Sequence, residues 1–310
     1  MISGLHHVTA ICGPAQANVD TYAGTLGLRL VKQTVNFDDP GTTHLYYADG
    51  DARPGSVLTF FPWPSDGMRG RVGAGQATAT AYAVAPGALS QWLDRLPGAA
   101  LQVAPPTARF GQNVLTLRDP DGLVIELIET DDASGQWAGG PVPESMALGA
   151  FHSVTLCSYD PDATAHVLTE AYGYAEHGQD GDRLRLVNPR ADRAEFVDLF
   201  CGPQMQAGRM GIGTVHHVAF RAPDDDAELE ARETLLSMGL RPTPQIDRQY
   251  FRSVYTREPG GILFEIATDG PGFAVDEPAE SLGRSLQLPP QYEPQRAAIE
   301  ARLAPLDLPY

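Results

Sequence analysis

The feature that most constrains the fold of this 310-residue chain is an internal repeat. Two segments, RDPDGLVIELIE (118–129) and REPGGILFEIAT (257–268), match at most positions. Each joins a Pro/Gly turn to a β-branched apolar run, which is typical of a turn that leads into a buried strand. Four strand openings also resemble one another: GLHHVTA (4–10), AFHSVTL (150–156), GTVHHVAF (213–220) and, more weakly, AGQATATAYAV (74–84). A unit that recurs in this way indicates one supersecondary structure used four times.

After each opening comes the pattern of an amphipathic helix, and strand-like runs follow it. The helical patterns, each with a glycine at or just after its end, cover 15–28, 88–98, 162–174 and 227–240. The strand-like runs include 43–49, 56–63, 183–188 and 251–256. Each unit is therefore a strand, a helix and about three further strands, which predicts an α+β protein of four βαβββ modules.

The modules are expected to pair in the order in which they occur along the chain. Modules one and two would form a domain over residues 1–132, and modules three and four a second domain over 147–270. The Gly/Pro-rich, polar stretch 131–146 suits a linker between them. The periodicity ends after about residue 270, so 271–310 is predicted to be a tail packed on the body.

Composition excludes several classes of protein. A hydrophobic content of 43% with 20% charged residues is that of a globular protein. The net charge of −17 argues against nucleic acid or an anionic membrane surface as a partner, because no basic region would attract either. No apolar run approaches the ~20 residues of a membrane span, and no basic leader precedes the first strand, so a cytoplasmic location is expected. A homo-oligomer is compatible with the sequence.

The cysteines are Cys12, Cys157 and Cys201, an odd number at wide spacing and without a CxxC motif. This pattern indicates neither a disulfide framework nor a zinc cluster. All three are expected to be small buried core residues in a reducing compartment.

Adjacent histidines in two strand openings are the strongest functional signal. Successive strand side chains face opposite ways, so one histidine of each pair should point at the same place. Aligning GLHHVT with AFHSVT matches His6 with His152, and His7 with Ser153. The equivalent positions of modules four and two are His217 and about Ala79, while the two copied final strands match Glu265 with Glu126.

One set is therefore complete, namely His7, His217 and Glu265, whereas its copy around Glu126 has lost both imidazoles. This asymmetry predicts a metal site at the complete set. The structural alternative is that strand histidines are satisfied core residues and that a buried glutamate pairs with Arg or Lys, as is expected of Glu126.

With these residues, the chain resembles the vicinal oxygen chelate (glyoxalase/bleomycin resistance/extradiol dioxygenase) superfamily, and within it the hydroquinone 1,2-dioxygenase-type ring-cleaving dioxygenases. The resemblance covers residues 4 to about 268, with a further match in the tail. It rests on GLHHVT, RFGQ (109–112), HHVAF, YFRSVYTREPGGILFE (250–265) and ESLGRSLQLPPQYE (280–293). It implies modules whose mixed sheets curl around a metal cleft.

The resemblance implies a cofactor and a reaction. Two neutral imidazoles and one carboxylate form a facial triad that leaves positions open for substrate oxygen and O₂. Fe(II) is the leading choice, Mn(II) uses the same ligands, and Zn(II) or Ni(II) would fit a glyoxalase-type isomerase. The implied function is an Fe(II)-dependent extradiol-type ring-cleaving dioxygenase, with a hydroquinone or related small dihydroxy-aromatic and O₂ as its partners.

Four residues match pocket positions of that family: His6, His216, Arg248 and Tyr255. Thr9 has the same strand parity as His7 and is therefore a fifth pocket candidate. Arg248 is suited to holding an oxyanion, whereas Tyr255, His216 and His6 are acid/base candidates. His6 and His216 would need a local twist or an edge position to face the pocket, and His44 is expected to be a core or edge histidine.

Two other functions are compatible with the same fold. A metal-dependent glyoxalase-type lyase or isomerase would ordinarily have a second carboxylate among its ligands, and none adjoins His7 or His217. A non-catalytic protein that binds aromatic drugs would not need the complete set of two histidines and a glutamate.

Overall fold

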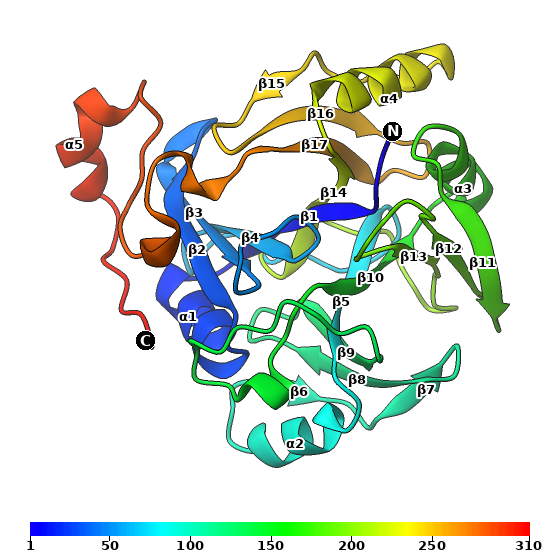
Figure 1. The fold of residues 1–310 in the computed structure, drawn as a ribbon, viewed down its shortest axis with the longest axis horizontal. Helices are drawn as coiled ribbons and strands as arrows, with labels where there is room; N and C mark the ends of the chain where they lie inside the picture. The colour runs from blue at the N-terminus through cyan, green and yellow to red at the C-terminus, as the bar shows by residue number, and fades with distance from the viewer.

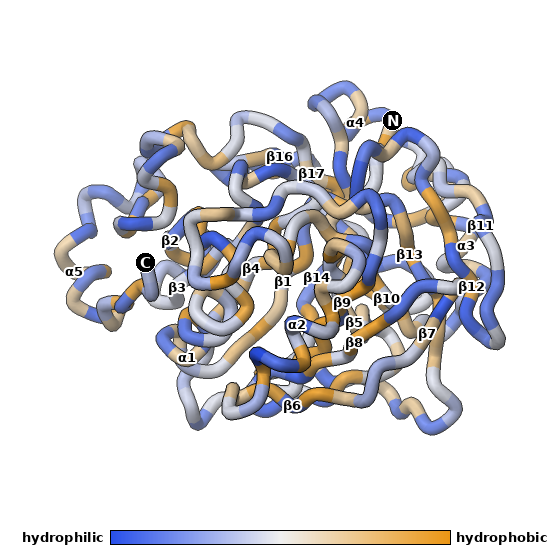
Figure 2. Tube along the Cα trace, turned by 60° about the horizontal axis from the view of Figure 1, so that its bottom comes forward, coloured by the Kyte–Doolittle hydropathy of each residue, from blue (hydrophilic) through white to orange (hydrophobic).

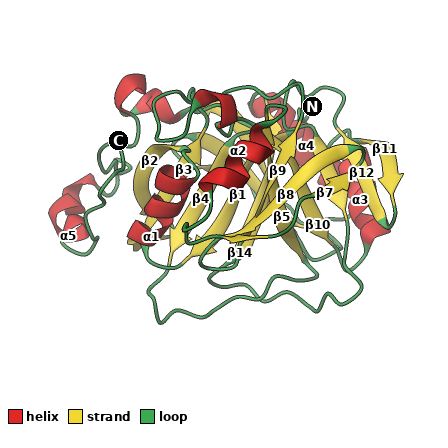
Figure 3. Cartoon of the chain, turned by 90° about the horizontal axis from the view of Figure 1, so that it is seen from below, coloured by secondary structure: helices red, strands yellow, loops and turns green.

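The computed structural model describes residues 1–310 as two curled sheets that lie side by side, with helices around their periphery (Figures 1 and 3). The main core contains 53 buried residues drawn from all four modules. Hydrophobic segments gather along the central strands, whereas the outer loops are mostly hydrophilic (Figure 2). The mixed α+β class and the curled mixed sheets predicted from the sequence are confirmed.

The first sheet has eight strands from modules four and one. Their order is β15 (Ile246–Asp247), β16 (Phe251–Arg257), β17 (Leu263–Pro271), β14 (Thr214–Ala222), β1 (Leu5–Cys12), β4 (Val57–Pro62), β3 (Asp39–Ala48) and β2 (Arg29–Asn36). We refer to it as the 1/4 sheet.

The second sheet, the 2/3 sheet, has nine strands from modules three and two. Their order is β11 (Ala175–Asp180), β12 (Arg183–Val187), β13 (Phe196–Leu199), β10 (Phe151–Cys157), β5 (Gln76–Val84), β9 (Val124–Glu129), β8 (Gln112–Arg118) and β6 (Gln102–Val103), with β7 (Thr107–Arg109) also paired to β8.

Helices follow the first strand of each module, as the sequence predicts. They are α1 (Ala15–Val19), which continues as a π-helical turn (Asp20–Thr25), α2 (Ala88–Arg95), α3 (Pro161–Glu170) and α4 (Asp225–Ser237). Side chains of Asp160 and Asp224 accept hydrogen bonds from backbone N–H groups of the first turns of α3 and α4, which supplies N-terminal caps. A short α5 (Arg296–Glu300) lies in the tail. None of these helices has both the length and the apolar character needed to cross a bilayer.

Module pairing differs from the expected order. In each module the last strand pairs in parallel with the first, which leaves the other edge of the first strand free. That edge pairs antiparallel with the first strand of another module, β1 with β14 and β5 with β10. The expected pairing of modules one with two and three with four is therefore wrong, because module one pairs with four and module two with three. The edge of a strand presents the same backbone N–H and C=O groups to any partner strand, so the local sequence pattern could not distinguish the two arrangements.

The tail packs on module one, as expected, and lies beside β2 and β3 in Figure 1. The buried ammonium of Lys32 in β2 lies 2.6 Å from Asp276 Oδ1 and 2.5 Å from Glu277 Oε1. The Tyr292 hydroxyl donates to the Phe37 carbonyl at 2.7 Å. These contacts hold the β2–β3 turn in place.

The cysteine prediction is wrong for two of the three residues. Cys157, at the end of β10, and Cys201, just after β13, form a disulfide, and only Cys12 is a free buried thiol. The two half-cystines are 44 residues apart, with Cα atoms 4.7 Å from each other. Parallel pairing of β10 with β13 brings them together, which sequence spacing does not reveal.

Candidate metal centre and cleft

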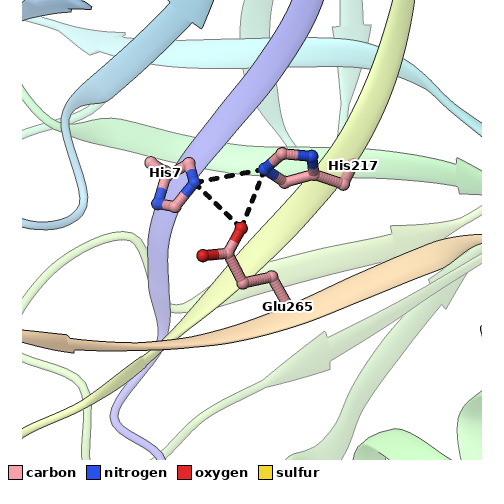
Figure 4. A group of neighbouring side chains, drawn as sticks. All are labelled: His7, His217 and Glu265. Carbon is pink, nitrogen blue, oxygen red and sulfur yellow. Dashed lines mark hydrogen bonds and ion pairs between the residues drawn. The ribbon is translucent and has the colours of Figure 1, made fainter. Parts of the chain in front are cut away.

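The three predicted ligands converge on one face of the 1/4 sheet (Figure 4). Glu265 Oε2 lies 2.8 Å from His217 Nε2 and 3.2 Å from His7 Nε2, and the two Nε2 atoms are 3.3 Å apart. All three side chains are buried. They come from three adjacent strands, β1, β14 and β17.

Strand register explains this convergence. His7 pairs with Ala219, which pairs with Glu265 on the next strand, so all three side chains share one face. His217 lies two residues before Ala219 and therefore points the same way.

The same register recurs in the 2/3 sheet, where Ser153 pairs with Ala81, Ala81 with Glu126, and Thr155 with Ala79. The alignment of Ser153 with His7, of Ala79 with His217 and of Glu126 with Glu265 is confirmed.

Two β-bulges explain how adjacent histidines cooperate. His6 is the extra residue between the pairs Leu5–Phe220 and His7–Ala219, and His216 is the extra residue between Thr9–His217 and Ala10–Val215. A bulge adds one residue to one strand and re-aims its side chain, which supplies the twist that strand alternation required. His6 Nδ1 thereby lies 2.9 Å from His7 Nδ1, and His216 Nδ1 lies 2.8 Å from His217 Nδ1.

These contacts assign the tautomers. If Nε2 of His7 offers its lone pair to an ion, Nδ1 carries the proton and donates to His6 Nδ1. His6 Nε2 then carries its proton and donates to the Thr268 carbonyl at 3.1 Å. Burial lowers the pKa of His6 to about 3, with the nearby His7 acting in the same direction, so the ring is neutral.

His217 and His216 repeat this arrangement with one difference. His217 Nδ1–H donates to His216 Nδ1, but the Nε2–H of His216 has no protein partner, and the ring lines the cleft. Burial and the neighbouring His217 lower the pKa of His216 to about 3. His6 is thus fixed at both ends, whereas His216 presents a free donor.

The residues present fit a metal ion. Ser253 Oγ donates to Glu265 Oε1 at 2.5 Å, but no hydrogen bond of ordinary geometry reaches the buried Oε2. Atoms bound at ~2.0–2.2 Å in adjacent octahedral positions lie about 3.0 Å apart, against about 3.4 Å for tetrahedral positions. The observed separations of 2.8, 3.2 and 3.3 Å are in the range expected of three atoms that bind one ion.

Electrostatics favour the ligating protonation states of Glu265 and His217. Burial alone would raise the pKa of Glu265, but His7 and His217 hold it well below its usual range. Burial lowers the pKa of His217, so at neutral pH a carboxylate faces a neutral imidazole.

A cleft of about 280 Å³ opens beside this set. Its lining residues are His7, Thr9, Asn36, Phe37, Asp38, His44, Tyr46, Phe61, His216, His217, Arg248, Phe251, Tyr255 and Leu263. Four of the five predicted pocket residues are among them. The fifth, His6, is buried behind His7 and does not reach the cleft.

Arg248 and Tyr255 form one wall. The Arg248 guanidinium carbon lies 5.4 Å from the centre of the Tyr255 ring, and its Nη2 lies 3.2 Å from Asp38 Oδ2. Burial raises the pKa of Tyr255, with the nearby Glu265 acting in the same direction, so its phenol remains a hydrogen-bond donor at neutral pH.

Sequence reasoning missed other parts of the wall. His44, expected in the core or at an edge, lines the cleft with Tyr46, two residues along the same strand face. Asn36 ends β2, and Phe37 and Asp38 form the β2–β3 turn, which the tail holds in place. Alternation in THLYYAD could have placed His44 and Tyr46 on one face, but the repeat alignment offered no counterpart for them.

In the 2/3 sheet, arginine side chains lie at the position that corresponds to the candidate metal site. Arg109 Nη2 lies 2.6 Å from Glu126 Oε2, which confirms the expected Arg partner. The buried Arg185 pairs with Asp198 through both carboxylate oxygens, at 2.7 and 3.0 Å. This sheet keeps the module geometry without the imidazoles.

Comparison with known proteins identifies the family of the chain. Residues 4–127 match the model of the Glyoxalase/Bleomycin resistance protein/Dioxygenase superfamily. A Bacillus subtilis (strain 168) protein provisionally named a ring-cleaving dioxygenase, MhqO, is 45% identical over 98% of this chain and 97% of its own. The chain belongs to this superfamily. Chlorohydroquinone/hydroquinone 1,2-dioxygenase of Sphingobium indicum is 35% identical over 94% of this chain and 93% of its own.

Solved structures extend the comparison. A crystal structure described provisionally as a dioxygenase from Bacillus subtilis superposes with a TM-score of 0.94 at 44% identity, over 99% of this chain and 98% of that one. Glyoxalase I from Zea mays shares the superfamily fold, with a TM-score of 0.65 at 14% identity, over 86% of this chain and 92% of that one. The names of the close relatives bear out the expectation of an oxygenase enzyme.

Proposed function

We propose that this protein is an Fe(II)-dependent extradiol-type ring-cleaving dioxygenase that acts on a hydroquinone or a related dihydroxy-aromatic. The observation that carries the proposal is the convergence of His7, His217 and Glu265 beside an aromatic-lined cleft. Two neutral imidazoles and one carboxylate on one face are the ligand set of non-haem Fe(II) oxygenases. Mn(II) would use the same three atoms.

The metal, when bound, would acidify a phenolic hydroxyl and hold the ring and O₂ together. His7, His217 and Glu265 would hold it, and Ser253 fixes the glutamate through its second oxygen. Phe61 and Phe251 provide apolar walls for a single aromatic ring.

Polar side chains of the cleft are placed to manage charge and protons. Arg248 stabilises negative charge that develops on a substrate oxygen, and the neutral Tyr255 donates a hydrogen bond to it. His216 offers its free Nε2–H as a general acid. His6 acts only through His7, whose ring it orients.

The relatives support the substrate class. The Sphingobium indicum protein is named for both chlorohydroquinone and hydroquinone, and this chain covers nearly its whole length. The glyoxalase-type alternative, with Zn(II) or Ni(II), lacks its second carboxylate: Asp38 is the only carboxylate lining the cleft beside the set, and it is exposed and paired with Arg248. A purely drug-binding protein has no use for a buried three-ligand set.

The test is oxygen uptake by protein loaded anaerobically with Fe(II), using hydroquinone, chlorohydroquinone and catechol as substrates. We expect uptake with at least one of the hydroquinones and an ultraviolet spectrum of a ring-opened product. Glu265→Gln should abolish both metal retention and uptake, whereas Glu126→Gln, at the copied position of the 2/3 sheet, should retain both. Absence of uptake with every substrate in fully iron-loaded wild-type protein would contradict the proposal.

A further inference from the structure

A row of hydrogen bonds begins beside the candidate metal centre and crosses three adjacent strands, β1, β4 and β3. The Tyr46 hydroxyl lies 2.9 Å from His44 Nδ1, and His44 Nε2 lies 2.8 Å from Thr59 Oγ1. Thr59 Oγ1 lies 2.9 Å from Thr9 Oγ1. Strand register aligns the row, because Tyr46 pairs with Thr59 and Thr59 pairs with Thr9.

The two ends of this row reach different parts of the cleft. Thr9 pairs with the candidate ligand His217 and lies two residues from His7. Tyr46 lies two strands away, roughly 10 Å at ordinary strand spacing. Thr9, His44 and Tyr46 line the cleft, but Thr59 does not, and it is fully buried.

Each group in the row both donates and accepts. A neutral imidazole has one N–H and one lone pair, and a hydroxyl has both functions. Burial holds the pKa of His44 well below its usual value, with His217 acting in the same direction, so the ring is neutral. The ring is also held between two aromatic side chains, with centroid distances of 4.1 Å to Tyr46 and 4.3 Å to Phe61.

Two arrangements of protons satisfy all three hydrogen bonds. In the first, Thr9 donates to Thr59, Thr59 to His44 Nε2, His44 Nδ1–H to Tyr46, and Tyr46 to the cleft. In the second, every bond is reversed, and Thr9 donates to the cleft. The two arrangements contain the same number of protons and carry no charge. One becomes the other when a proton enters at one end of the row, each proton moves one place along it, and a proton leaves at the other end.

We propose that Tyr46, His44, Thr59 and Thr9 form a proton relay that carries the proton of a substrate hydroxyl away from the candidate metal centre. This inference rests on the proposed function and deepens it. Thr9 and Tyr46 exchange protons with what occupies the cleft, and Thr59 and His44 carry the proton between them.

The step balances in protons and involves no oxidation. The substrate hydroxyl gives its proton to Thr9 Oγ1 as the Thr9 proton passes to Thr59 and the Thr59 proton to His44 Nε2. His44 Nδ1–H passes its proton to Tyr46, and the former Tyr46 proton goes to water in the cleft. One proton leaves the substrate and one reaches water, and the row ends in the reversed arrangement. When Thr9 protonates the product, the protons shift back along the row and Tyr46 takes up one proton from water in the cleft, which restores the first arrangement.

Thr59→Val tests the relay, because it removes the central hydroxyl at nearly constant volume and without altering the cleft lining. We expect kcat to fall at least ~10-fold with little change in the KM for the aromatic substrate, together with a changed solvent deuterium isotope effect. Thr59→Ser should restore kcat. Thr80→Val is the matched control, because Thr80 is a buried strand threonine of the 2/3 sheet whose hydroxyl has no partner.

A second readout does not depend on turnover. The ¹⁵N spectrum of the histidine side chains should show both His44 nitrogens hydrogen-bonded in the wild type and Nε2 released in Thr59→Val. If the valine variant does not fold, His44→Gln interrupts the same row with a group that cannot relay a proton, and the same loss of kcat is expected.

The outcomes separate the relay from the proposed function. Wild-type uptake with unchanged kcat and isotope effect in Thr59→Val would overturn the relay and leave the dioxygenase proposal standing. Absence of uptake in the iron-loaded wild type would overturn both. Loss of kcat in Thr59→Val with rescue by serine, and none in Thr80→Val, supports the relay.

Discussion

His6→Phe is the substitution that tests most directly whether His6 orients the ring of the candidate ligand His7. It keeps a ring of similar size next to Phe251 but removes two buried hydrogen bonds, 2.9 Å to His7 Nδ1 and 3.1 Å to the Thr268 carbonyl. Loss of the partner that orients a ligating histidine typically lowers metal affinity 10–100-fold, about 1.4–2.7 kcal/mol. The unpaired groups should also lower the unfolding free energy of the metal-free protein by on the order of 1–3 kcal/mol.

The 2/3 sheet supplies a matched control. His152 is the bulge residue equivalent to His6, and its ring makes two contacts of the same kind, 3.1 Å to Ser153 Oγ and 3.1 Å to Gln112 Oε1. His152→Phe should therefore lower stability by a similar amount. Its metal affinity should be unchanged, because Ser153 stands where His7 is the ligand.

The assay is a chelator competition with Fe(II) under anaerobic conditions, together with thermal unfolding of the metal-free proteins. We expect a weaker metal complex for His6→Phe than for His152→Phe at comparable stability. Equal affinities in the two variants would refute the reasoning, because the His6 contact would then contribute only to folding.

Three further predictions concern groups outside the centre. Lys32→Met should lower the unfolding free energy by about 3–5 kcal/mol in denaturant titration, because it leaves Asp276 and Glu277 without their buried cation, and a loss below ~1 kcal/mol would contradict this. Burial raises the pKa of Glu228 from 4.5 to about 7. The unfolding free energy of the wild type should therefore fall as the pH rises through that window. In Glu228→Gln this fall should be smaller by on the order of 1–3 kcal/mol. Parallel unfolding curves at pH 5 and pH 8 would show that Glu228 is not the cause. Thiol titration of the denatured, unreduced protein should find one thiol, Cys12, and three thiols would rule out the Cys157–Cys201 bond.

The module repeat and the convergence of His7, His217 and Glu265 could be predicted because both follow from local patterns. Copied strands keep copied registers, so aligning Ser153 with His7 in the sequence also aligned them in space. The loss of both imidazoles beside Glu126, with Arg109 as its partner, follows the same logic.

Features that depend on which strands meet could not be predicted. Local composition does not indicate that β1 pairs with β14. It also does not indicate that β10 and β13 are neighbours, which is what brings Cys157 to Cys201. The bulges at His6 and His216 can be recognised only once the residue-by-residue pairing of β1 with β14 is known. The domain boundaries, a homo-oligomeric state and a cytoplasmic location remain predictions.

The most direct test of the central claim is anomalous diffraction at the iron edge from crystals of the Fe(II)-loaded protein. We expect one strong peak per chain, ~2.0–2.2 Å from His7 Nε2, His217 Nε2 and Glu265 Oε2. A peak beside Glu126, or none near Glu265 in protein that retains iron, would contradict the assignment of this site.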